Sequence, residues 1–182
     1  GGGNGNIAAC LLSYLLDTTA TYYLDKKMTP LKYQHYFKNR AGFLLSNQFI
    51  YKDSITKRYY FKVKPRARNH YKGKVYVLAD GGTFSSAAFA ASLLKHKAKA
   101  VFIGRETGGS EYAIGGGVIG KLILPYSGIA IKFPFYKWDF NSAPVNTGKG
   151  VIPDFPVQHN AGDISQNTDP DLEKAIELIS KK

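Results

Sequence analysis

The stretch from Lys74 to Gly109, KVYVLADGGTFSSAAFAASLLKHKAKAVFIGRETGG, constrains the fold more than any other part of the sequence. It begins with a short apolar run, Val75 to Ala79, which is typical of a buried strand in a parallel sheet. A helix rich in small residues is expected over Ser85 to Lys95, and a second strand over Ala100 to Ile103. Strand, helix and strand within about 30 residues predict a right-handed βαβ unit.

This order places Ser85 at a sharp junction between a strand and a helix. The aligned N–H groups of a first helical turn favour negative charge, so the N–H of Ser86 is positioned to donate to an oxyanion formed when Ser85 attacks a carbonyl. A second donor is expected from the glycine loop at the start of the sequence, Gly2 or Gly3. A serine at a helix start is more often a cap, so from the residues alone both roles stay open.

The beginning of the chain predicts a helix over Ile7 to Leu16, with Asn6 as its N-cap. Its apolar residues cover most of the circumference, and we therefore expect it to be buried on more than one side. Cys10 lies on this helix and is expected to be a packed thiol. It is also the one cysteine of the sequence, which excludes an internal disulfide.

Strands and turns account for most of the remaining sequence, which fits a single domain of 182 residues with an α/β fold. Asp169 and Pro170 have the chemistry of an N-cap and a first helical position, so a helix is expected from there to Lys181. The segment from Phe43 to Tyr51 is compatible with a strand or a short helix. Other expected elements are strands over Thr18 to Leu24 and Ile55 to Lys64, a loop over Pro65 to Tyr71, a β-hairpin of Val118 to Pro125 with Ile129 to Phe135, and an extended piece in Gly148 to Val157.

Composition excludes several classes of function. The four histidines are far apart and only one cysteine is present, so no metal site and no cofactor are predicted. The carboxylates are spread over different loops, which argues against a glycosidase pair. The net charge is +12, with local density at Lys57–Arg58 and from Lys62 to Lys74. We interpret this charge mainly as solvated surface and expect no nucleic-acid partner, although a basic binder of nucleic acid remains an alternative. No apolar run is long enough to span a membrane.

Four ordered motifs closely resemble the C-terminal processing (tail-specific) peptidases, a group that includes the tricorn protease core and the interphotoreceptor retinoid-binding protein repeats. The first is the opening Gly-Gly-Gly-Asn, which is similar to the end of that family's Asn-Gly-Gly-Gly loop. The terminal Asp-Pro-x-Leu-Glu-x-Ala helix is similar too. The motifs are Gly1 to Asn4, Gly81 to Ala88, Val101 to Gly109 and Gly150 to Val157.

The resemblance implies a crotonase-like (ClpP-like) α/β core for residues 1–182, with a preceding strand and a PDZ-like domain in full-length members. It places Ser85 at the nucleophile position, and the Ser86 N–H with Gly2 or Gly3 at the oxyanion positions. The implied activity is serine-type endopeptidase cleavage of a polypeptide substrate. The implied location is the bacterial periplasm or cell envelope. Oligomeric state is not predicted.

The sequence departs from that family where the general base is expected. Ser110 stands at the place of the lysine of the Ser-Lys branch, and Thr147, next to Asn146, stands at the place of the glutamate of the tricorn-like branch. A serine without a base is a poor nucleophile at neutral pH. Two hypotheses follow: a C-terminal part of a larger peptidase that is poorly active alone, or a non-catalytic module that binds a peptide or an apolar ligand on the same fold.

Overall fold

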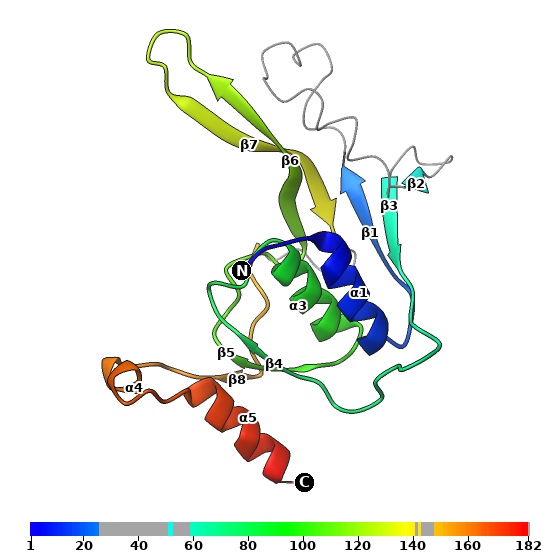
Figure 1. The fold of residues 1–182 in the computed structure, drawn as a ribbon, viewed down its shortest axis with the longest axis vertical. Helices are drawn as coiled ribbons and strands as arrows, with labels where there is room; N and C mark the ends of the chain where they lie inside the picture. The colour runs from blue at the N-terminus through cyan, green and yellow to red at the C-terminus, as the bar shows by residue number, and fades with distance from the viewer. Residues whose placement is uncertain (26–50, 53–58, 141, 143–147, 182) are drawn as a thin grey trace. The chain divides into compact units, whose positions relative to one another are not determined.

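The computed structural model describes residues 1–25, 51–52, 59–140, 142 and 148–181. Three predictions lie wholly or mostly outside these residues: those for Phe43 to Tyr51, for the start of the strand expected from Ile55, and for Thr147. The chain divides into two units: one of residues 1–20, 63–112 and 142–182, the other of residues 21–62 and 113–141. Figure 1 shows the helices and strands of both.

The first unit contains a parallel sheet in the order β4-β5-β8. β4 is Tyr76–Ala79, β5 is Val101–Gly104 and β8 is Phe155–Pro156. Helix α3, Ser86–His96, joins β4 to β5, which pair in parallel with Tyr76 opposite Val101. The predicted strand–helix–strand unit is therefore confirmed, to within a residue or two at each end.

Helix α1, Gly5–Leu15, corrects three predictions. The N-cap is Asn4 and not Asn6, because the Asn4 side chain accepts the N–H of Asn6 at 2.8 Å. The helix packs against α3 (Figure 1), but it is not buried on several sides. Ile7 is 71% exposed, and Cys10 is also exposed and not a packed thiol. Small α3 residues admit α1 on one face only, which leaves the other apolar face uncovered.

Helix α5, Pro170–Ser180, begins as predicted. The Asp169 side chain caps it by accepting the N–H of Leu172 at 3.1 Å. It contacts β4 and β5 through a face on which Ala175 and Asp171 are buried. Most of the other apolar side chains of α5 lie outside this contact, since Leu172, Ile176 and Ile179 are about half exposed. A short helix, α4, over Ala161–Ser165 was not predicted.

The second unit contains an antiparallel sheet in the order β2-β3-β1-β7-β6. The hairpin of β6 and β7 is longer than predicted, and Gly128 with a φ of 68° turns the chain between its strands. β1 pairs with β7, which places the predicted first strand in the same sheet. The strands are β1 Ala20–Asp25, β2 Tyr51–Lys52, β3 Tyr59–Val63, β6 Ala113–Ile123 and β7 Ala130–Asp139.

Candidate active site

Ser85 occupies a strained turn between β4 and α3. Its φ of 54° and ψ of −126° lie outside the regions that residues with a side chain normally adopt. The turn before it is closed by the Thr83 N–H, which donates to the Asp80 carbonyl at 2.9 Å, and by the Gly82 N–H on the Asp80 carboxylate at 2.9 Å. Backbone of this kind costs of order 1–3 kcal/mol and is concentrated at functional sites.

The Ser85 side chain does not cap helix α3. Ser85 stands at the N-cap position, yet its hydroxyl makes no capping hydrogen bond. The first N–H groups of a helix have no partner within the helix, and Ser86 supplies the first of them in α3. The commonest structural role for a serine at this position is therefore excluded, and the hydroxyl is left at the end of an array of helical N–H dipoles.

The opening glycine loop lies directly against Ser85. A Cβ placed on Gly2 would be 2.9 Å from the Ser85 Cβ and 3.4 Å from its Oγ, so only glycine fits there without a shift. The Ser86 hydroxyl donates to the Gly3 carbonyl at 2.7 Å, which ties the loop to the first turn of α3. The fold thus brings together all four predicted site residues, although they are more than eighty positions apart in the sequence.

The second glycine turn packs on the Ser85 turn from the β5 side. A Cβ on Gly108 would lie 2.1 Å from the Gly81 carbonyl oxygen, which no side chain tolerates. The Gly109 N–H donates to the Thr83 carbonyl at 3.0 Å. A Cβ on Gly109 would lie 2.5 Å from the Ala88 Cβ, so a side chain is excluded at both places. The hydrogen bond to Thr83 helps to hold the segment before Ser85 in its bent form.

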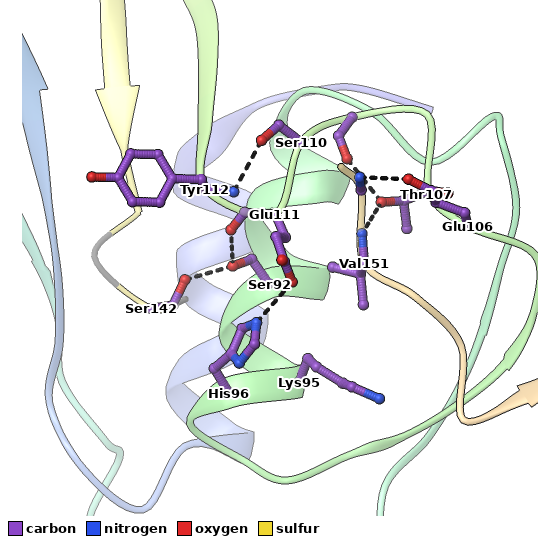
Figure 2. A network of polar contacts seen from close by, with 12 residues as sticks. Ser92, Lys95, His96, Glu106, Thr107, Ser110, Glu111, Tyr112, Ser142 and Val151 are labelled. Atoms are coloured by element: carbon purple, nitrogen blue, oxygen red, sulfur yellow. Dashed lines mark hydrogen bonds and ion pairs between the residues drawn. The ribbon is translucent and has the colours of Figure 1, made fainter. Parts of the chain in front are cut away.

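Glu106 and Thr107 attach the Gly150 element to this turn (Figure 2). The Glu106 carboxylate accepts the Gly150 N–H at 2.8 Å, and the Thr107 hydroxyl accepts the Val151 N–H at 2.8 Å. The same hydroxyl donates to the Gly109 carbonyl at 2.8 Å, and Thr107 is buried. We did not predict these supporting roles. Polar residues inside a glycine-rich turn were the available signal.

Asp154 fastens the same element to β5 and α3. Its carboxylate accepts the Phe102 N–H at 2.8 Å and the Lys95 ammonium at 2.5 Å. Partial burial opposes its ionisation, but the hydrogen bonds from Lys95 and Phe102 and the Lys95 charge outweigh that effect and hold the pKa below its usual 3.8. The carboxylate is therefore ionised at neutral pH and acts as a structural anchor.

A second polar cluster joins α3 to the segment that follows the glycine turn, as Figure 2 shows. The Ser92 hydroxyl is fully buried, donates to the Glu111 carbonyl and lies 2.5 Å from the Ser142 hydroxyl. His96 lies 3.0 Å from the Glu111 carboxylate. Buried polar groups of this kind fix one arrangement of the chain because each is costly to leave unpaired.

His96 is too far from Ser85 to serve it as a general base. His96 follows Ser85 by 11 residues, which is about 16 Å along the helix axis. His70 and His159 pair with Asp17 and Asp171 at 3.0 Å. Ser110, at the position where a lysine is expected, accepts the N–H of Tyr112 at 3.1 Å.

An apolar groove of about 470 Å³ begins beside the opening glycines and runs between α1, α3 and β4. Leu78, on β4, is 42% exposed and contributes to its wall. Ser86 and Thr83 are its polar members near the Ser85 turn. Apolar walls with a few polar groups at one end are typical of a ligand site.

The comparison with protein-family models identifies the family of this chain. The family model described as peptidase family S41 matches residues 1–157. The chain belongs to peptidase family S41. All four sequence motifs fall inside the match and only the terminal helix lies beyond it, so the resemblance read from the residues is confirmed. S41 is a family of serine peptidases, which agrees with the placement of Ser85 in the turn described above.

Solved structures share the mixed α/β fold of this S41 domain. A candidate peptidase from Parabacteroides merdae is 20% identical with a TM-score of 0.61, over 98% of this chain and 48% of that one. Mature CPAF complexed with lactacystin is 19% identical with a TM-score of 0.60, over 99% and 42%. This chain therefore spans less than half the length of those structures. No curated protein matches it.

Within residues 1–25, 51–52, 59–140, 142 and 148–181, no three histidine, cysteine or acidic side chains gather in a way that would hold a metal ion. The helices that the structure describes include none with the length and apolar character needed to cross a membrane.

Proposed function

We propose that this chain carries the nucleophile of a serine endopeptidase, with Ser85 forming an acyl-enzyme. The observation that supports the proposal most is the geometry of Ser85: a strained strand-to-helix turn, a hydroxyl that caps nothing, and the Gly2 backbone packed against it. Strained turns that present a serine at a helix start are a known device of serine hydrolases.

The proposed chemistry follows from these contacts. The Ser85 oxygen attacks the carbonyl carbon of a peptide bond, and its proton passes to a general base. The Ser86 N–H and an N–H of Gly2 or Gly3 stabilise the oxyanion. The amine leaves with a proton, and water then hydrolyses the ester. Removing one oxyanion donor typically costs about 10²–10³ in rate.

Within the described residues, no hydrogen bond joins the Ser85 hydroxyl to a general base. We therefore propose that residues 1–182 act within a longer peptidase of crotonase-like fold, on a polypeptide substrate, in the periplasm or cell envelope. On this proposal the isolated chain turns peptides over poorly. Full turnover by residues 1–182 alone would contradict it.

A serine-reactive fluorophosphonate probe tests the role of Ser85 in the longer protein. We expect labelling of Ser85 that Ser85→Ala abolishes. Ser165→Ala, which changes an exposed serine on α4, is the matched control and should label normally. Labelling spread equally over several serines, or unchanged in Ser85→Ala, would refute the proposal.

Two observations favour a second candidate function, a non-catalytic module that binds a peptide or an apolar ligand. The groove beside Ser86 is apolar and of ligand size, and Ser110 replaces the expected lysine. The two functions differ in their response to Ser85→Ala. If the parent protein turns peptides over and Ser85→Ala does not, catalysis is supported. If the parent protein shows no turnover and Ser85→Ala still binds the ligand with the parent affinity, the binding function is supported.

A further inference from the structure

The segment from Lys64 to Lys74 has a basic residue at every second position. None of the residues 64–79 is acidic, and none of the residues 1–16 is acidic either. The five lysines and arginines of the segment are exposed, whereas His70 is turned inward. We call this stretch the basic segment; its cations are Lys64, Arg66, Arg68, His70, Lys72 and Lys74.

The basic segment is fastened to the last turn of α1. The N–H groups of Arg66 and Tyr71 donate to the carbonyls of Ser13 and Tyr14 at 2.7 and 2.8 Å. These carbonyls are among the last four of the helix, which have no partner within it. His70 pairs with Asp17 at 3.0 Å, just beyond the helix end. The exposed cations are therefore held beside α1 and do not belong to a freely moving loop.

The exposed face of α1 is apolar where the cations adjoin it. Ile7 and Leu11 are 71% and 54% exposed, and with Tyr14 they occupy one side of the helix at positions i, i+4 and i+7. The Arg66 guanidinium lies 4.4 Å from the centre of the Tyr14 ring. Helix α1 therefore carries no charged side chain, exposes aliphatic side chains on one side, and ends next to the cations of the basic segment.

We propose that α1 and the basic segment together form a docking surface for an anionic lipid bilayer. Charge complementarity supports this partner, since each lysine or arginine near an anionic membrane contributes about fivefold in affinity. Ile7 and Leu11 decide between lipid and nucleic acid. Burying exposed aliphatic side chains at the acyl boundary of a membrane contributes favourable binding free energy. Nucleic-acid phosphates give such side chains no favourable contact, and proteins that bind single strands use aromatic stacking instead. Ile7 and Leu11 also line the groove beside Ser86, so a bilayer and a ligand in that groove would compete for them, whereas the basic segment lies outside the groove.

Vesicle binding by residues 1–182 tests the proposal. The probes are vesicles of neutral phosphatidylcholine with and without about 30% anionic phosphatidylglycerol, in low salt. We expect binding only to the anionic vesicles, and its loss at about 0.5 M salt, where charges are screened over a few ångström. Equal binding to both vesicles, or binding to neither, would overturn the proposal.

Two sets of variants locate the surface. Lys64→Gln, Arg68→Gln and Lys72→Gln together should weaken binding about a hundredfold at fivefold each. Lys97→Gln, Lys99→Gln and Lys121→Gln together lower the net charge equally and should weaken it far less. A similar loss in both sets would attribute the binding to overall charge and refute the surface.

The aliphatic pair gives the remaining test. Ile7→Gln with Leu11→Gln should reduce binding to anionic vesicles about tenfold or more, with the helical circular dichroism signal unchanged. A single-stranded oligonucleotide is the contrasting probe. Oligonucleotide binding that exceeds vesicle binding and is insensitive to the Ile7/Leu11 change would show that the partner is nucleic acid and that the lipid proposal is wrong.

Discussion

The exchange Gly2→Ala tests the proposed site at its tightest contact. The new Cβ would be 2.9 Å from the Ser85 Cβ and 3.3 Å from the Phe84 ring, against 3.4 Å at the start of ordinary contact. Carbon atoms prefer 3.5–4.0 Å, so the loop and Ser85 must separate by about 1 Å. A misplacement of about 1 Å between reacting groups costs about a hundredfold in rate.

Gly3→Ala is the matched control for this exchange. A Cβ on Gly3 would meet no atom within 4 Å, and the Gly3 carbonyl that accepts the Ser86 hydroxyl stays in place. The assay is the second-order rate constant for fluorophosphonate labelling of Ser85 in the longer protein. We expect a fall of about a hundredfold for Gly2→Ala and a change within about threefold for Gly3→Ala.

Two results would refute the reasoning. A Gly2→Ala protein that labels at the parent rate would show that the opening loop does not set the reactivity of Ser85. Equal losses in both variants would show that any side chain in this loop is harmful and that the Gly2 contact has no special role. Thermal unfolding followed by circular dichroism should be nearly unchanged in both, because the loop precedes α1.

Three further predictions concern the supports of the site. Thr107→Val leaves the buried Val151 N–H without its 2.8 Å acceptor and should lower the free energy of unfolding by about 2 kcal/mol, whereas Thr107→Ser should cost less; equal losses in urea unfolding would contradict this. Because the folded-state pKa of Asp154 is lowered, its ionised form stabilises the fold above its usual pKa and this contribution is lost as the pH falls below about 4. The stability difference between the parent and Asp154→Asn should therefore shrink on acidification, and a difference that grows would be contrary evidence. Asp169→Ala removes the cap of α5 and should lower the free energy of unfolding by about 1 kcal/mol, measured by thermal or urea unfolding. Asp169→Asn keeps a capping side chain and should lose only a small part of that stability.

The unit of β4, α3 and β5 was predictable because its signals are local. A short apolar run, a glycine turn and a helix of small residues follow each other within 36 positions, and each predicts its own element. The β-hairpin of the second unit was predicted for the same reason, although too short. Where burial had to be inferred from composition alone, the prediction failed. Cys10 and Ile7 are exposed because α1 buries only the side that carries Ala9 and Leu12.

The sequence predicted which residues make up the candidate site but not how they are arranged. Ser85 and Ser86 were named from their place at a strand-to-helix junction, and Gly2 and Gly3 from the opening loop. The roles of Glu106 and Thr107 were not foreseen, because their partners lie 44 residues away in the Gly150 element. The sequence also named Ser110 and Thr147 as departures from the family. The structure adds that Ser110 is engaged by the Tyr112 N–H.

By itself, then, the sequence determined the order of the elements, the serine at the junction and the kinship with S41 peptidases, since all three are carried by contiguous motifs. Only the tertiary structure decided that Ser85 adopts a strained backbone and caps nothing. It also decided that the opening loop is tied to α3 across 83 positions by the Ser86 hydroxyl. The physical reason is that the strained φ and ψ of Ser85 persist only when the surrounding structure holds them, and the contacts of the opening loop and the second glycine turn exist only once the chain has folded.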